Sequence, residues 1–286
     1  MLGPNNYGKA EVRVLRVDRG ADKHEIADLN VSVALSGDLA ATHLTGENDN
    51  VLPTDTQKNT VYAFAREGIG SPESFGLRLA RHFVDSQPSI ERARIGIEKY
   101  AWDQNDRHSF ARAGDVVDTT AVTYDGTTAW VVAGLTGLVL LNTTNSEFSG
   151  FIVDRYTTLA PTTDRILATS VDAEWRYSVD DADWPALREF ARQALVGKFV
   201  TTYSYSLQQT LYQMGQAVLD EVPEVAEVRL SLPNRHHFLV DLAPFGLDNP
   251  GEVYFPADRP YGLIEGTVLR EGAPPPGLAW SLRSGE

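Results

Sequence analysis

Alternating hydrophobic and polar residues mark the start of the chain. The segment DLNVSVALS (28–36) places its aliphatic residues on one face and polar or small residues on the other. This alternation is typical of a β-strand with one buried face. The earlier segment GKAEVRVLRV (8–17) is also rich in strand-forming residues, and the turn-forming DRGADK between the two predicts a hairpin.

Apolar residues then recur every three or four positions, which predicts helices. The predicted helices span 54–67, 71–83, 180–199 and 206–221. Ser71 and Asp183 stand where an N-cap is expected, and Pro72 and Pro185 follow within the first turn. The apolar face predicted for the third helix consists of Leu187, Phe190, Ala191, Ala194 and Phe199.

Strand-like segments surround both pairs of helices, so the order β-β-α-α-β-β occurs twice. They lie at 8–17, 28–36, 91–102, 118–126, 128–142, 163–177, 225–242 and 252–270. The repeated order predicts an α+β protein of two units, 1–127 and 128–286, each an antiparallel sheet with two helices on one face. The Pro-rich GAPPPG (272–277) is expected to form a C-terminal tail or an oligomer contact.

Composition excludes several classes of function. The 286 residues carry a net charge of −14 without a basic stripe, which argues against nucleic-acid binding. The absence of cysteine excludes disulfides, thiolate nucleophiles and cysteine-ligated metals. The six histidines lack the spacing of a metal site, so we expect no metal, and no dinucleotide-binding glycine motif is present.

The sequence also bears on location. MLGPNNYGK lacks the pattern of a signal peptide, and the longest apolar run, AWVVAGLTGLVLL (129–141), is too short to span a membrane. The final SLRSGE is not a peroxisomal address. We therefore expect a cytoplasmic protein without a membrane partner.

Candidate chemistry lies in several separate stretches, and each also has an ordinary structural explanation. Lys9 begins a strand, where a lysine discourages edge pairing. Thr54 and Asp55 precede a helix, where either residue can cap. Phe148 and Arg165 are compatible with a core aromatic and a surface ion pair. Taken singly, none of these residues indicates a function.

The stretch SLPNRHHFLVDL (231–242) contains two adjacent histidines. In a continuous strand, Asn234 and His236 would share one face and His237 would lie on the other. Only one of the two histidines could then act at a given site. Gln208, at the start of a predicted helix, is a further polar candidate.

Taken in order, the motifs YGK, TDTQKNTVYAFA, SEFSGF, RYTTL with TTDRILAT, LQQTLYQM and SLPNRHHFLVDL resemble the urate oxidase (uricase) family. The resemblance extends from about residue 6 to residue 270. It implies two tandem tunnelling-fold (T-fold) units that assemble into a β-barrel tunnel in a homotetramer, with active sites at subunit interfaces. It also implies an oxidoreductase that converts urate, O₂ and water to 5-hydroxyisourate and hydrogen peroxide without a cofactor.

The resemblance assigns roles to the candidates. The catalytic group would consist of Lys9, Thr54 and His236. The urate and oxygen site would contain Thr54, Asp55, Phe148, Arg165, Leu207 (through its backbone), Gln208 and Asn234. In the family, the positions of Lys9, Thr54 and Asp55 come from one chain and the remaining site residues come from its neighbour. Lys9 would act as base through the Thr54 hydroxyl and exchange protons with His236, while Asn234 and Thr54 would hold O₂ and then water.

Two other functions stay open from the sequence. One is a T-fold enzyme that acts on a pterin or purine, such as a cyclohydrolase, although zinc-dependent forms use cysteine ligands and this chain has none. The other is a purine-binding homo-oligomer without turnover. Such a binder would have no use for a Lys–Thr–His proton relay.

Overall fold

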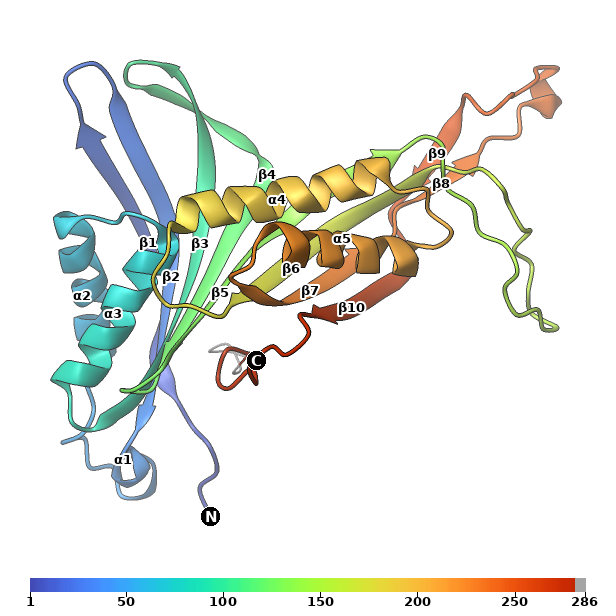
Figure 1. The fold of residues 1–286 in the computed structure, drawn as a ribbon. Helices are drawn as coiled ribbons and strands as arrows, with labels where there is room; N and C mark the ends of the chain where they lie inside the picture. The colour runs from blue at the N-terminus through green and yellow to red at the C-terminus, as the bar shows by residue number, and fades with distance from the viewer. Residues whose placement is uncertain (281–286) are drawn as a thin grey trace.

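The computed structural model describes residues 1–280 and contains one long antiparallel sheet (Figure 1). The order across the sheet is β1-β2-β3-β4-β5-β6-β7-β10. Its strands are β1 (Tyr7–Arg19), β2 (His24–Gly37), β3 (Ile90–Asp106), β4 (Ser109–Tyr124), β5 (Ala129–Asn142), β6 (Leu167–Tyr177), β7 (Val225–Pro233) and β10 (Leu263–Leu269). Strands that follow one another in the chain are therefore neighbours in the sheet, except where β8 and β9 intervene before β10.

The helices pack on one face of this sheet. They are α2 (Thr54–Glu67), α3 (Pro72–Ser86), α4 (Trp184–Thr201) and α5 (Leu207–Glu221). The short helix α1 (Ala40–Leu44) and the 3₁₀ turn η1 (Ala243–Phe245) have no buried residues. Helices α2 and α3 pack against β1, β3 and β4, whereas α4 and α5 pack against β5, β7 and β10. None of the helices in residues 1–280 is long and apolar enough to cross a membrane.

The two faces of the sheet differ as the alternation predicts. On β2, Leu29, Val31, Val33 and Leu35 are all 0% exposed and contribute to the core beneath the helices. Residues between them, such as Ser32, point to the opposite, polar face. The predicted caps Ser71 and Asp183 are confirmed, because the Ser71 Oγ accepts from the Ser74 amide at 3.1 Å and the Asp183 carboxylate accepts from the Ala186 amide at 3.3 Å. Neither Thr54 nor Asp55 caps α2, which follows Pro53 without a side-chain cap. The α+β fold is confirmed, and each half follows the predicted order apart from the short α1 after β2 and the strands β8 and β9 before β10.

The strand predicted over 225–242 is wrong in one respect. It ends at Pro233, and β8 (His236–Leu239) pairs instead with β9 (Tyr254–Ala257) in a separate two-stranded sheet. Between the two strands the chain leaves the ladder, because the Arg235 amide donates to the carbonyl of Ala168 at 2.8 Å. The predicted strand 252–270 is divided in the same way, into β9 and β10. Side-chain alternation therefore does not continue from Asn234 to β8.

One position of the predicted helix stripe is also wrong. Phe190 is 45% exposed, although the periodicity placed it on the apolar face of α4. The buried side of α4 is defined by Ala191, Leu195 and Phe199, which are four residues apart. Phe190 precedes this line by one residue, which corresponds to about 100° around a helix.

The division into units 1–127 and 128–286 remains a prediction. The sheet crosses it without a break, because β4 pairs with β5 from Val117 opposite Thr136 to Tyr124 opposite Ala129. The segment predicted as a tail lies on the polar face of the sheet, where Arg176 donates to the Pro274 carbonyl at 2.9 Å. The final SLRSGE (281–286) lies outside the described residues.

A buried ion pair joins the two halves beneath the sheet. Glu73 of α3 is 1% exposed and pairs with Arg188 of α4. Arg188 also donates to the Gly134 carbonyl at 2.7 Å, to the Thr119 carbonyl at 3.1 Å and to the Thr120 hydroxyl at 2.7 Å. The guanidinium therefore contacts the sheet on both sides of the predicted boundary.

We expect Arg188→Met to destabilise the protein by about 3–5 kcal/mol, because it leaves the Glu73 carboxylate buried without its counter-ion. Denaturant unfolding followed by circular dichroism measures this change. Arg192→Met is a matched control, since Arg192 lies on the same helix and makes no ion pair within residues 1–280. Equal unfolding midpoints for the two variants would contradict the predicted role of the pair.

Candidate active site

Three of the candidate residues lie together where β1 meets α2. Lys9 is on β1 opposite Val33 of β2, and Thr54 and Asp55 are the first residues of α2. The Lys9 charge contributes to lowering the pKa of the Asp55 carboxyl, which places the two side chains within electrostatic reach. The structure therefore brings Lys9, Thr54 and Asp55 into one group, while the roles that the resemblance assigns to them remain a prediction.

Neighbouring residues of α2 stabilise the negative charge of Asp55. The Lys58 ammonium lies one turn along α2 and pairs with the Asp55 carboxylate, and this contact is the main reason that the pKa of Asp55 is lowered. The Asn59 amide also donates to Asp55 at 3.1 Å. A negative charge is further favoured at the N-terminus of a helix. Asp55 is therefore an anion at neutral pH and lies within electrostatic reach of Lys9.

A tyrosine ties the start of α2 to β1. The Tyr7 hydroxyl accepts a hydrogen bond from the Leu52 amide at 2.9 Å and donates to the Leu52 carbonyl at 3.1 Å. The buried Gln57 donates to the same carbonyl at 3.2 Å. Burial raises the pKa of Tyr7, so the phenol keeps the proton that it donates. The segment that leads into Thr54 is thus held against the strand that carries Lys9.

Gly8 explains the glycine of the YGK motif. A Cβ at this position would lie 1.7 Å from the Val33 carbonyl oxygen, so any side chain would push β1 away from β2. The sequence pointed to Lys9 in this motif but not to Tyr7. In the sequence, Tyr7 was marked only by its place before Gly8 in the YGK motif. Its hydrogen-bond partner Leu52 is 45 positions away, so the sequence does not show the contact.

A second group is built around Phe148 and Arg165. Phe148 forms a short antiparallel bridge with Thr162, with N–O distances of 2.9 and 3.0 Å. The Arg165 guanidinium carbon lies 5.2 Å from the centre of the Phe148 ring. Arg165 is half-buried, and this desolvation lowers its pKa, although an arginine remains a cation at neutral pH. The pair offers an aromatic face next to a planar positive charge.

Backbone hydrogen bonds connect the N-terminus of α5 to the segment that carries Phe148. Ser206 caps the helix, and its Oγ accepts from the Gln209 amide at 3.1 Å. Leu207 and Gln208 are the first two helical residues; the Leu207 side chain is buried and Gln208 is exposed. The Ser204 carbonyl accepts from the Glu147 amide at 2.8 Å, which connects this end of α5 to the segment that carries Phe148.

Asn234 and His236 lie at the same end of the sheet. Asn234 bridges to Thr169 of β6, and its amide donates to the Gly262 carbonyl at 2.8 Å. His236 is on β8, and its ring stacks on Phe238 with the centres 5.8 Å apart. His236 and Phe238 share one face of β8. The His237 Nδ1 instead lies 3.1 Å from the Arg235 carbonyl oxygen, so the two histidines have different surroundings.

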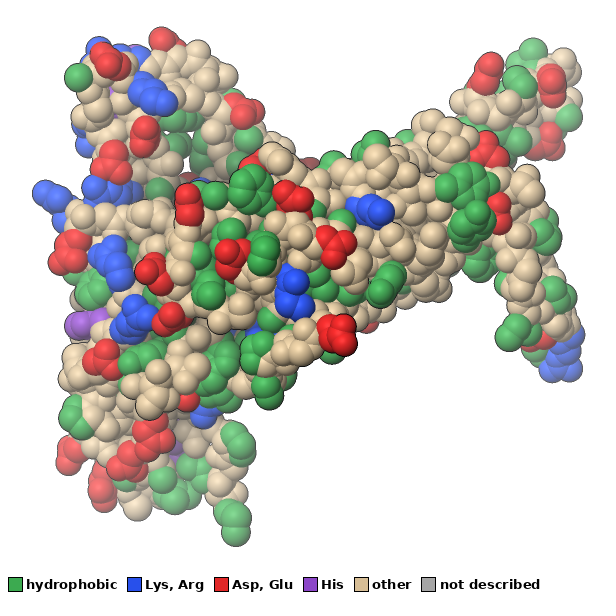
Figure 2. Space-filling model, in the orientation of Figure 1, with side chains coloured by type: hydrophobic (Ala, Val, Ile, Leu, Met, Phe, Trp, Pro, Cys, Tyr) green, Lys and Arg blue, Asp and Glu red, His purple; other side chains and the backbone are tan. Residues whose placement is uncertain are grey.

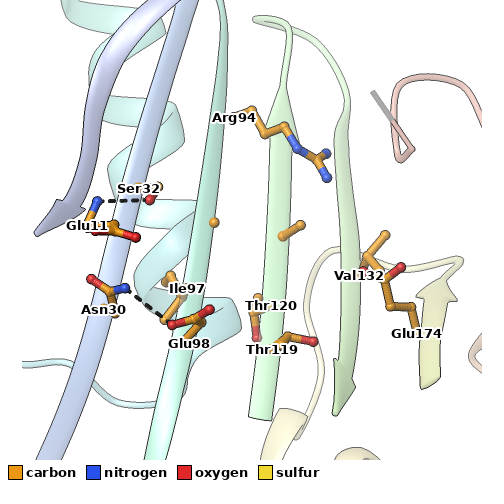
Figure 3. Close-up of a pocket in the computed structure, with 12 residues that line it drawn as sticks. Glu11, Asn30, Ser32, Arg94, Ile97, Glu98, Thr119, Thr120, Val132 and Glu174 are labelled. Atoms are coloured by element: carbon orange, nitrogen blue, oxygen red, sulfur yellow. Dashed lines mark hydrogen bonds between the residues drawn. The ribbon is translucent and has the colours of Figure 1, made fainter. Parts of the chain in front are cut away.

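The two groups lie at opposite ends of one chain. In Figure 1, β1 and α2 are at the left end of the sheet, while β8 and β9 project at the right end. One copy of the chain therefore does not bring Lys9 and Thr54 to His236. The pocket drawn in Figure 3 lies on the polar face, where Glu11, Ser32 and Glu174 are among its lining residues, and it contains no candidate residue.

No group of three His, Asp or Glu side chains within residues 1–280 could hold a metal ion. This observation concerns side chains of a single chain. The expectation of a reaction without metal or cofactor therefore stays a prediction.

Comparison with known proteins gives a consistent result. The profile of a family described as Uricase matches residues 5–126 and 131–265. A uricase from Arthrobacter globiformis is 50% identical over 287 residues, which covers 100% of this chain and 95% of the relative. A uricase from Danio rerio is 38% identical, with 93% of each chain covered.

Solved structures agree with these relatives. The crystal structure of the uricase from Arthrobacter globiformis superposes with a TM-score of 0.96 at 49% identity and covers 99% of both chains. A uricase from Bacillus fastidious gives a TM-score of 0.81 at 25% identity, with 94% of both chains covered.

Proposed function

The chain belongs to the uricase family and oxidises urate, and we propose that it does so at a site assembled from two copies of the chain. One observation carries this proposal. The group of Lys9, Thr54 and Asp55 lies at one end of the sheet, and the group that contains Arg165 and His236 lies at the other end (Figure 1). A neighbouring copy would complete the site if the end of its sheet that carries Lys9 packed against the end of this sheet that carries His236.

Surface features of the chain support such an assembly. The edge strands β1 and β10 offer unpaired backbone groups to another copy. Two segments project beyond the sheet (Figures 1 and 2): the loop between β5 and β6, and the segment that contains β8, η1 and β9. Exposed large apolar side chains include Ile152 and Tyr156 in the first segment and Phe245 and Phe255 in the second. Exposed apolar surface of this extent is typical of a protein–protein interface. The proposed assembly is a homotetramer in the cytoplasm, with the polar faces of the sheets lining a tunnel.

The group around Arg165 suits a planar anion. Phe148 can stack on the urate ring, and the Arg165 fork can donate to its carbonyl and nitrogen acceptors. The first backbone amides of α5, at Leu207 and Gln208, point out of the helix end without helical partners. They add donors and a positive partial charge, and the Gln208 side chain can bind the adjacent edge.

The group around Lys9 manages protons. Lys9 takes a proton from urate through the Thr54 hydroxyl, and His236 of the neighbouring copy exchanges protons with Lys9. The electron-rich urate then gives two electrons to O₂, which takes up two protons, the one that Lys9 removed from urate and a second from solvent, and leaves as hydrogen peroxide. Asn234 and Thr54 hold O₂ and afterwards the water that adds to the ring to give 5-hydroxyisourate. The substrate is its own reductant, so the protein supplies only position and proton transfer.

The alternatives raised by the sequence are a pterin-acting T-fold enzyme and a purine binder without turnover. The family match does not favour either of them.

We expect turnover of urate by protein that has been treated with a chelator and dialysed. Loss of urate absorbance, oxygen uptake and peroxide release should agree in a ratio of one to one to one. Dependence of the rate on an added metal would contradict the proposal, and urate binding without oxygen uptake would identify a binder.

We expect His236→Gln to lower kcat by about 10²–10⁴-fold, the usual range for loss of a proton-transfer group. His237→Gln is the matched control, because His237 lies next to it on β8 and contacts the Arg235 carbonyl instead. Steady-state kinetics with urate separates the two variants. Equal losses of kcat would refute the assignment of His236 as the residue in the site.

A further inference from the structure

A β-bulge lies in β1 directly after Lys9. Lys9 and Val12 are paired with residues of β2 that are only two positions apart. Two residues of β1, Ala10 and Glu11, therefore lie opposite a single residue, Ser32. An extra residue on one strand is the defining feature of a bulge, and bulges often re-aim a side chain next to an active site.

The bulge decides which face of the sheet Lys9 occupies. Lys9 lies opposite Val33 and Val12 lies opposite Val31, and both valines of β2 are 0% exposed beneath the helices. In a regular strand, residues three positions apart point to opposite faces. Without the extra residue, a strand that keeps Val12 in the core would turn Lys9 to the polar face. The bulge thus directs Lys9 to the side on which α2 packs.

Glu11 holds the bulge in an unfavourable backbone conformation. Its φ is 57°, in the left-handed region that residues other than glycine rarely adopt. The Glu11 amide donates to the Ser32 hydroxyl at 3.1 Å (Figure 3). Ser32 therefore gives the displaced amide a partner across the strand pair, which stabilises the bulge against the regular register.

Ser32 itself does not belong to the urate site. It points to the polar face of the sheet, where it lines the pocket of Figure 3, whereas Lys9 and Thr54 are on the side of the helices. On its other side, Lys9 is fixed by Gly8 and by the Tyr7 contact with Leu52. The backbone around Lys9 is therefore fixed on both sides, by the contacts of Tyr7 and Gly8 before it and by the bulge after it.

We propose that Ser32 is a positioning residue for urate oxidation, because its hydroxyl stabilises the bulge that turns Lys9 towards Thr54. The proposal rests on the proposed function, since it takes Lys9 as the base. Ser32 contacts neither urate nor Lys9, so its effect acts through the backbone of β1.

The test first compares steady-state kinetics of three variants of the full chain. Ser32→Ala should lower kcat by roughly 10–100-fold, because small displacements of a reacting group have effects of this size. KM for urate should change by less than about twofold, since the Phe148 and Arg165 group is intact. Ser32→Thr keeps the hydroxyl and should retain kcat. Ser36→Ala is the control on the same face of β2, and its side chain makes no hydrogen bond within residues 1–280.

Substitutions at Glu11 test the bulge without altering Ser32. Glu11→Gly accepts the positive φ without strain, so it should restore kcat when it is combined with Ser32→Ala. Glu11→Val should lower kcat as Ser32→Ala does, because a β-branched residue resists this conformation. Circular dichroism and hydrogen exchange at the amide of residue 11 report on folding and on the bulge independently of activity.

The outcomes separate this proposal from the proposed function. If the wild type oxidises urate and Lys9→Met does not, but Ser32→Ala has normal kcat, only the positioning role is overturned. A loss that neither Ser32→Thr nor Glu11→Gly corrects would also overturn it. If the wild type fails to oxidise urate, or Lys9→Met is fully active, the role of Lys9 and this proposal fall together.

Discussion

The length and stiffness of one antiparallel sheet constrain everything else in this protein. Lys9 of β1 and Thr54 of the neighbouring helix α2 lie at one end of the sheet, and the segments around Arg165 and His236 lie at the other. Its hydrogen-bonded ladder continues without a break from β1 to β10, so no local rearrangement of a single chain brings these groups together. In the proposed mechanism, catalysis therefore depends on contact between copies, and each copy contributes one of the two groups of site residues.

Each half is held by backbone contacts more than by contacts among the candidate side chains. At one end, the Tyr7 hydroxyl forms two hydrogen bonds with the Leu52 backbone, and the bulge turns Lys9 towards the helices. At the other end, the capped α5 and the short bridge through Phe148 hold their side chains on irregular segments. A half-site that is rigid before assembly loses little conformational freedom when urate binds, which is the advantage of preorganisation.

Much of this arrangement follows from the sequence. Alternation in 28–36 and helical spacing in 54–67 and 206–221 predict their elements, because local burial and capping determine these structures. Such patterns do not predict the local structure where contacts between distant segments of the chain determine it. Nothing in SLPNRHHFLVDL shows that the strand ends before His236, and the bulge at Glu11 depends on a serine of another strand. The candidate residues came from the resemblance to a family, since no single one is distinctive by its type or spacing.

The central claim is that one active site takes residues from two chains. It is tested most directly by co-expressing Lys9→Met and His236→Gln chains with different affinity tags and purifying the oligomers that contain both. Each variant alone lacks one half of every site and should have almost no turnover. In mixed oligomers, roughly a quarter of the sites combine the intact half of one variant with the intact half of the other, so about that share of wild-type activity should return. Mixed oligomers no more active than the separate variants would contradict the account, because every site would then belong to a single chain.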